Sequence, residues 1–350
     1  MSTTAELVKR KLVLDAIAHK ETWRIPHLIL YQPDIGKALA TYYSVEDLEV
    51  ILGDAVEWIG DRLSTSALHK LGLLRDGKYT DEWGARWHGV GATRGQVMAP
   101  PLRESTLKGY RFPERVSPAI LEQMKSQATQ NAHKYRVAKL GALWEQATFL
   151  RGMADLLMDL ILHPTFVHDL LEGITGYLLS NLDLYHRELK VECMWLSDDY
   201  GSQSALLMPP RLWRAFVAPR LRRICEAVHA RGYHFALHSD GAIGDVIPDL
   251  VEMGVDLLHP VQSECLDVRR VKQEFGRHLT IWGGYGSQGT LVFGTPAQVW
   301  REVNEVCDVL GAAGGFILSP GLGLHNEVPL GNAVAFIEMA KARERGASPE

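Results

Sequence analysis

The sequence predicts an α/β protein, a single (β/α)8 TIM barrel domain that spans residues 1–350. Two observations favour this fold. Short apolar segments typical of buried parallel strands alternate with longer amphipathic helical segments, and eight strand segments can be counted. Several of these strands are followed directly by acidic residues or histidines, as strands are at the C-terminal mouth of a barrel. A doubly wound open sheet is the alternative fold.

The composition is that of an ordinary globular protein. Of the 350 residues, 46% are hydrophobic and 23% are charged, and the formal net charge is -5. No stretch concentrates Lys and Arg, so neither nucleic acid nor an anionic membrane is expected as a partner. The N-terminus lacks a signal-peptide pattern and no apolar run is long enough to cross a bilayer, so a cytoplasmic location is expected. The four cysteines are widely spaced, which predicts reduced thiols.

The N-terminal part of the chain begins with a helix and two strands. Apolar residues at helical spacing predict a helix over 4–20. A buried strand is predicted over 25–31, where an apolar run ends in a Gln-Pro-Asp sequence. Ser44 followed by Asp47 indicates the start of a second helix. A weaker strand is predicted over 55–59.

Residues 63–113 lack a regular pattern and are rich in Gly, Trp, Arg and Pro. A long irregular stretch inside a compact domain is typical of a functional insertion. Its most structured part, residues 79–88, is predicted to form a hairpin. That hairpin either covers the pocket or packs on the barrel wall.

Strands and helices alternate regularly in the rest of the chain. A long helix is predicted over 165–189, and another over 211–230 is expected to kink at Pro219. Asp267 and Thr295 are predicted to cap two later helices. The predicted strands are 140–149, 192–197, 234–238, 255–259, 279–283 and 315–319.

A histidine and an aspartate follow the strand over 234–238. In an extended segment residues i and i+2 point to the same side, so His238 and Asp240 can reach one zinc ion. Glu145 or His259, at the ends of other strands, could supply a further ligand. The alternative is that Asp240 only accepts a hydrogen bond from His238 or caps the next helix.

Two adjacent aspartates follow another strand. Asp198 and Asp199 would face opposite sides, so we expect one to reach the pocket and the other to bind loop amides or an arginine. A carboxylate among apolar neighbours can be held partly protonated and act as a general acid. Glu145 could act as a general acid for the same reason. The candidate catalytic residues are Glu145, Asp198, Asp199 and His259, and the candidate substrate-binding residues are Tyr31, Trp83, Trp144, Tyr200, Gln262 and Tyr285.

Short motifs along nearly the whole chain carry a family resemblance. They include Asp81-Glu82-Trp83-Gly84, Gly141-Ala142-Leu143-Trp144-Glu145, Asp198-Asp199-Tyr200-Gly201, His238-Ser239-Asp240-Gly241, Leu258-His259-Pro260-Val261-Gln262 and Trp282-Gly283-Gly284. With these motifs the sequence resembles the uroporphyrinogen decarboxylase superfamily. The resemblance implies the (β/α)8 barrel independently of the strand count.

The resemblance implies one of two reactions. The true decarboxylases hold the carboxylates of a porphyrinogen with an arginine-rich segment after the first strand. The matching segment here, residues 27–33, contains no arginine, so that clamp is lacking. In the other branch, corrinoid-linked methyltransferases, some members bind zinc through a His-x-Cys pair and a later Cys. This chain keeps His238, but has Asp240 and Gly321 at or near the two Cys positions.

A harder ligand set of His238, Asp240 and Glu145 would polarise an oxygen rather than a sulfur. The resemblance therefore predicts an O-demethylating methyltransferase, which takes a methyl group from a small, aromatic donor with the help of zinc. The acceptor would be cobalamin on a separate corrinoid protein, because the chain lacks an Asp-x-His-x-x-Gly cobalamin-ligand pattern. The alternative function is that of a porphyrinogen decarboxylase or related cofactor-free carboxy-lyase. A third possible function is that of a non-catalytic ligand-binding barrel. A homodimer is compatible with each of these three functions.

Overall fold

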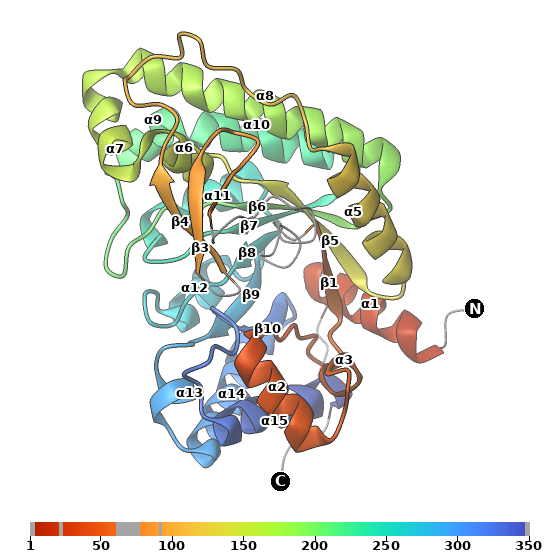
Figure 1. Cartoon of the computed structure of the whole chain (residues 1–350). Coiled ribbons are helices and arrows are strands. Elements are labelled where there is room, and N and C mark those ends of the chain that lie inside the picture. The colour runs from red at the N-terminus through yellow and green to blue at the C-terminus, as the bar shows by residue number, and fades with distance from the viewer. Residues whose placement is uncertain (1–3, 21–23, 61–77, 91–92, 347–350) are drawn as a thin grey trace.

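A curled parallel sheet of seven strands forms the centre of the molecule (Figure 1). The computed structural model describes residues 4–20, 24–60, 78–90 and 93–346. The strands pair in the order β1-β5-β6-β7-β8-β9-β10, and every neighbouring pair is parallel. They are β1 (Val56–Ile59), β5 (Tyr135–Gly141), β6 (Cys193–Ser197), β7 (His234–His238), β8 (Leu257–His259), β9 (Thr280–Tyr285) and β10 (Phe316–Pro320).

Residues 25–31 occupy the place of the eighth strand. His27 forms a parallel bridge with Leu318 of β10, while its carbonyl accepts a hydrogen bond from the Ala55 amide, just before β1. This segment is not a regular strand, because Pro26 has no amide hydrogen to donate to a ladder. The buried carboxylate of Asp54 accepts the Ile29 amide at 2.9 Å instead. The predicted (β/α)8 barrel is confirmed, with one irregular member.

Helices surround the sheet, as Figure 1 shows. None of the helices in the described part of the chain combines the length and the apolar character needed to cross a bilayer. The α-helices are α1 (Thr4–Ile17), α2 (Pro33–Tyr43), α3 (Glu49–Leu52), α5 (Pro118–Gln130), α6 (Trp144–Arg151), α7 (Met153–Leu162), α8 (Pro164–Glu188), α9 (Pro210–Phe216), α10 (Ala218–His229), α11 (Ile247–Met253), α12 (Val268–Phe275), α13 (Thr290–Phe293), α14 (Pro296–Gly311) and α15 (Leu330–Arg345).

The barrel interior is packed with side chains from alternate strand positions. Tyr135 and Val137 of β5 share a buried cluster with Cys193 and Trp195 of β6. Val13 and Ile17 of α1 belong to the same cluster, so this helix closes one end of the barrel. Only the opposite end, where the strands terminate, is therefore available for a reaction pocket.

Most predicted helix ends in the C-terminal half are confirmed. Asp267 accepts hydrogen bonds from two amides at the start of α12, and Thr295 forms a capping box at the start of α14. The helix predicted over 211–230 is interrupted at Val217, so that α9 and α10 are separate helices just before Pro219.

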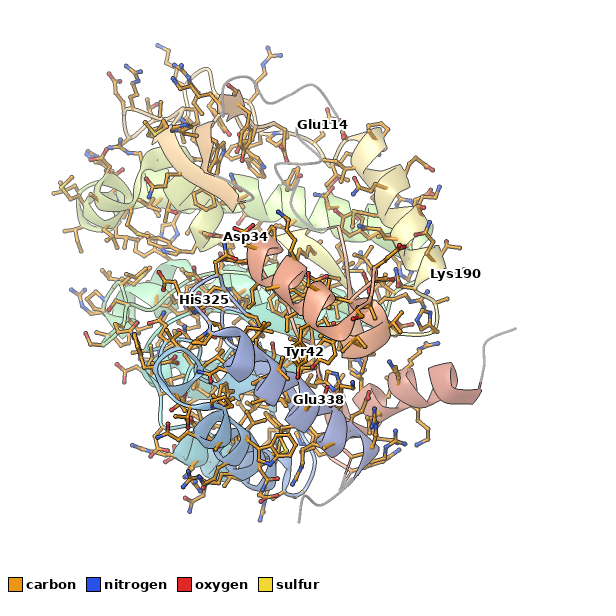
Figure 2. The ribbon with its side chains drawn as sticks, turned by 60° about the horizontal axis from the view of Figure 1, so that its bottom comes forward. Asp34, Tyr42, Glu114, Lys190, His325 and Glu338 are labelled. Atoms are coloured by element: carbon orange, nitrogen blue, oxygen red, sulfur yellow. The ribbon has the colours of Figure 1, made fainter. Side chains whose placement is uncertain are left out.

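The prediction that Ser44 begins a helix is wrong. Ser44 ends α2 with left-handed backbone angles, φ 54° and ψ 45°. The helix that it ends begins at Pro33, soon after the strand predicted over 25–31, because proline is favoured in a first helical turn. Asp34 at the start of α2 accepts a hydrogen bond from Asn326, and Tyr43 donates one to Glu338 of α15. Asp34 and Glu338 are labelled in Figure 2.

The strand predicted over 140–149 is also wrong beyond residue 141. The chain leaves β5 at Gly141, and residues from Trp144 onward form α6. This helix has no capping side chain from its own N-cap residue. Asp198, which follows β6, accepts the amides of Leu143 and Glu145 instead, each at 2.9 Å. The helix start is thus set by a residue far away in the sequence.

The insertion contains a small antiparallel sheet, with β2 (Lys78–Thr80), β3 (Arg86–Val90) and β4 (Thr93–Ala99). The hairpin predicted over 79–88 is confirmed, while residues 61–77 and 91–92 lie outside the described residues. Asp81 organises its turn, because one carboxylate oxygen accepts the amides of Trp83 and Ala85 and the other accepts the Trp87 indole at 2.8 Å. Trp83 is thereby held against Tyr177 of α8, with ring centroids 4.5 Å apart.

Replacing Asp81 with alanine is expected to lower the free energy of unfolding by about 1–2 kcal/mol, because several hydrogen bonds to a partly buried carboxylate are lost. Urea denaturation measures this change. Asp81→Asn is the matched control, since its remaining oxygen can still accept the two amides while its NH2 group faces the indole donor. We expect an intermediate loss for Asn. An alanine variant as stable as the wild type would contradict this role for Asp81.

Candidate functional site

A cavity of about 700 Å³ lies at the C-terminal ends of the strands. Its described walls are mainly aromatic and aliphatic. Trp58 and Trp195 lie close together there, with ring centroids 4.3 Å apart, and Trp282 packs against both of them. The other aromatic lining residues are Tyr79, Trp83, Tyr177 and Tyr185, and the charged or imidazole-bearing ones are Asp81, Glu82, Lys139, His238, Asp240 and His259.

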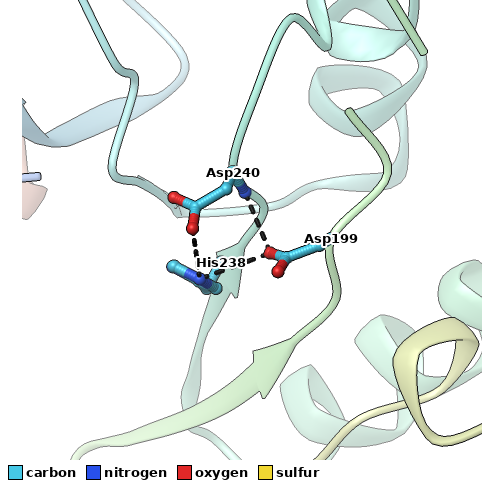
Figure 3. Close-up of side chains that lie close together, drawn as sticks. All are labelled: Asp199, His238 and Asp240. Carbon is cyan, nitrogen blue, oxygen red and sulfur yellow. Dashed lines mark hydrogen bonds and ion pairs between the residues drawn. The ribbon is translucent and has the colours of Figure 1, made fainter. Parts of the chain in front are cut away.

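Asp199, His238 and Asp240 form a compact polar group at this mouth (Figure 3). Each offers a ligand atom, and these atoms all lie within 4.8 Å of one another. His238 Nε2 is 3.4 Å from Asp199 Oδ1 and 3.8 Å from Asp240 Oδ2. Asp199 Oδ1 also accepts the Asp240 amide at 3.0 Å. One imidazole and two carboxylates therefore converge on one small volume.

The pairing of β6 with β7 brings this group together. Ser197, the last residue of β6, is in register with His238, the last residue of β7, so the residues that follow both strands are neighbours. The two segments that follow these strands then approach each other very closely. Gly241 has φ 87°, and a Cβ atom there would lie 2.5 Å from the Gly201 backbone. Only glycine tolerates both the positive φ and this approach.

His259 lies behind His238 and is buried. Its Nδ1 atom is 2.8 Å from His238 Nδ1, and its ring packs between Trp195 and Trp282. Burial lowers the pKa of His259 well below its ordinary value, and the neighbouring charge of His238 acts in the same direction. His259 is therefore neutral. When it accepts the hydrogen bond from His238 Nδ1, the lone pair of His238 Nε2 is directed at the carboxylates.

The group fits a divalent metal ion. Nitrogen and carboxylate oxygen donors are the ligands that zinc and related ions accept. Asp240 Oδ1 is buried and has no hydrogen-bond partner among the residues that the structure describes. Burial raises the pKa of Asp240, while the charge of His238 opposes this and Asp199 adds to it. A buried oxygen of this kind and two mutually repelling carboxylates would both be stabilised by a cation.

Asp198 faces away from this group. It is fully buried, and its second oxygen accepts the Tyr200 hydroxyl at 2.9 Å, in addition to the two amides of the α6 start. Burial raises its pKa to about 7, although the donated hydrogen bonds act against this rise. Asp198 thus holds the α6 start and Tyr200 in place, while Asp199 is the member of the pair that faces the site.

Glu145, predicted as a metal ligand, lies on a helix and not at a strand end. It lies in the first turn of α6 and is not a member of the compact group, in which Asp199 takes the place expected for it. The reason is the early end of β5, which moves Glu145 from a strand end onto a helix. Its charge still contributes to raising the pKa of Asp240.

Among the candidate substrate-binding residues, only Trp83 lines the cavity. Trp144 and Tyr200 are fully buried in the core, and the Tyr285 ring packs on Phe336 of α15. Gln262 accepts the Gly241 amide at 2.6 Å and so supports the loop after β7. Tyr31 is 44% exposed, outside the described lining. The sequence places these five residues near strand ends, but their side chains do not line the cavity.

The lining residues that were not predicted from the sequence include Trp58, Lys139, Tyr177 and Tyr185. The first two lie on β1 and β5, and both face inward by strand alternation. Strand alternation could have indicated both residues, but the predicted strand began at residue 140 and therefore omitted Lys139. The two tyrosines lie on α8, where helical spacing indicates core packing and carries no sign of a cavity.

Imidazole and carboxylate groups at the C-terminal mouth of a (β/α)8 barrel define the class of protein as a barrel enzyme. The chain belongs to the uroporphyrinogen decarboxylase (URO-D) family, whose model matches residues 92–343. Among solved structures, a methyltransferase from Methanosarcina mazei shares the fold, with a TM-score of 0.67 and 17% identity over 95% of this chain and 98% of that one. An endo-β-1,4-xylanase from Gloeophyllum trabeum has a TM-score of 0.47 and 12% identity, over 91% of this chain and 96% of that one. No curated protein matches the chain.

Proposed function

We propose that this protein is a methyltransferase that removes the methyl group of a small aromatic methyl ether and passes it to a corrinoid carried by a partner protein. The observation that carries the proposal is the Asp199, His238 and Asp240 group beside an aromatic-lined cavity. Membership of the URO-D family and the methyltransferase fold neighbour support it. The described lining holds a single lysine and no arginine, which suits a compact donor better than a substrate with many carboxylates.

Asp199, His238 and Asp240 would hold a zinc ion in this proposal. Bound there, zinc would supply Lewis-acid polarisation to the ether oxygen. Residues of this chain would orient the metal ligand and hold the donor. His259 orients the His238 ring through the contact between their Nδ1 atoms, and Trp58, Trp83 and Trp195 pack on the donor ring and exclude water.

The reaction balances without an external oxidant. The methyl carbon–oxygen bond breaks and its electron pair stays on the aryl oxygen, while the two electrons of cobalt(I) form the new cobalt–carbon bond. The aryl oxygen then takes up a proton, so the products are a phenol and a methylated corrinoid. The open mouth of the barrel has to admit the corrinoid of the partner, and closure of that mouth by the partner would complete the exclusion of water.

Metal analysis and a methyl-transfer assay on the purified chain test this function. We expect about one zinc per chain, and formation of methylcobalamin from cobalt(I) cobalamin and a methoxylated benzene, followed by its absorption spectrum. Removal of the metal by a chelator should stop the reaction, and added zinc should restore it. Equal activity of the metal-free chain would contradict the metal site. A zinc-loaded chain that decarboxylates a porphyrinogen but transfers no methyl group would favour the decarboxylase alternative.

A further inference from the structure

Gln146 is a buried polar residue on the wall of the cavity. It lies in the first turn of α6, lines the cavity, and has only 6% of its surface exposed. The turn that carries it is fixed, because Asp198 accepts the amides of Leu143 and Glu145 at the helix start. A side chain on such a rigid base is well placed to recognise one particular group of a ligand.

The carboxamide of Gln146 lacks the partner that a buried amide normally has. Its Nε2 atom is buried and has no hydrogen-bond partner among the residues that the structure describes. An unsatisfied buried donor costs free energy, and such groups in folded proteins are usually satisfied by water or by a ligand. Rotation about the last side-chain torsion, which is soft, can bring either atom of the amide to the cavity. Gln146 therefore has hydrogen-bonding capacity that the described fold leaves unused.

The chemistry of a carboxamide limits what it recognises. It donates from nitrogen and accepts at oxygen, so a hydroxyl group, which also does both, is its best match. Trp58 Nε1 likewise has no hydrogen-bond partner in the described part of the chain, but an indole only donates. The described lining carries three carboxylates and a single lysine, so a neutral substituent is favoured over an anionic one.

We propose that Gln146 is a hydroxyl-recognition subsite, and that the donor is a methoxyphenol whose ring hydroxyl exchanges hydrogen bonds with the Gln146 carboxamide. The methyl ether class of the ligand rests on the proposed function, whereas the hydroxyl subsite is measurable by binding alone. Gln146 and Asp240 line one cavity, and Glu145, next to Gln146, acts on Asp240 through its charge. A hydroxyl held at Gln146 would orient the ring, so that its methoxy group can reach the group formed by Asp199, His238 and Asp240.

Calorimetric titration of the zinc-loaded chain with the ortho, meta and para isomers of methoxyphenol and with methoxybenzene tests the subsite. The ligands share the ring and the methoxy group and differ in the hydroxyl. We expect the best-bound isomer to bind the wild type about tenfold more tightly than methoxybenzene. Gln146→Leu should lose this preference. Gln146→Glu should keep most of it, since a carboxyl group also exchanges hydrogen bonds with a hydroxyl.

Three controls separate recognition from other effects. The urea midpoint of the ligand-free Gln146→Leu chain should be no lower than that of the wild type, because leucine removes an amide that has no partner. Gln130→Leu changes an exposed glutamine of α5 and should bind like the wild type. His238→Ala should retain the hydroxyl preference, which distinguishes binding at Gln146 from phenolate binding to the metal.

Several outcomes would overturn the proposal. Equal affinity of the wild type for methoxybenzene and all three isomers would mean that water satisfies the amide. No binding of any ligand at millimolar concentration, or a preference that survives in Gln146→Leu, would also contradict it. A lower urea midpoint of Gln146→Leu would assign the amide a structural role instead. Hydroxyl-selective binding without methyl transfer to cobalt(I) cobalamin would contradict the proposed function and leave the subsite intact.

Discussion

Replacing His238 with alanine is expected to abolish metal binding and methyl transfer together. His238 Nε2 is the nitrogen donor of the group, and without it Asp199 and Asp240 face each other as two carboxylates that no imidazole balances. We expect the metal content to fall to background and kcat/KM for methyl transfer to fall by at least about a thousandfold, which corresponds to the several kcal/mol that a metal ion supplies to charge stabilisation. Metal analysis and initial rates measure both.

His186→Ala is the matched control for this change. His186 is exposed on α8, where its ring contacts Tyr233, and it takes no part in the cavity. Its removal should leave metal content and rate unchanged. An His238→Ala variant that still binds one metal ion with wild-type affinity would show that the ligands lie elsewhere.

Replacing Asp198 with alanine is expected to lower the free energy of unfolding by about 3–5 kcal/mol. The change leaves three donors without their acceptor: the amides of Leu143 and Glu145 and the hydroxyl of Tyr200. All lie in or next to the buried core, where an unsatisfied donor costs much more than at the surface. Urea denaturation followed by tryptophan fluorescence measures the loss.

Asp198→Asn separates this structural role from a catalytic one. The asparagine oxygen can still accept both amides, and its NH2 group can donate to the Tyr200 oxygen, so a stability close to that of the wild type is expected. Because Asp198 faces away from the cavity, Asn should also retain most of the methyl-transfer activity. A stable Asp198→Asn chain without activity would return Asp198 to the catalytic set.

Local patterns predicted those parts of the site that lie within one strand. His238 and Asp240 are two residues apart at the end of β7, and strand alternation alone puts both on one side. The strand itself was predicted with the correct bounds, because an apolar run between a helix and a glycine is a strong local signal. The caps at Asp267 and Thr295 are local in the same sense.

Tertiary structure decided the rest. Asp199 joins His238 through the register of β6 with β7, and Glu145 leaves the group because Asp198 caps α6 from another strand. Neither contact has a signature in nearby sequence. From the sequence alone, the barrel and most of its strands could be predicted, together with the residues that one strand carries to its mouth, since these depend on periodicity. Which side chains meet across strands depended on register and packing, because those are set by contacts between residues far apart in the chain.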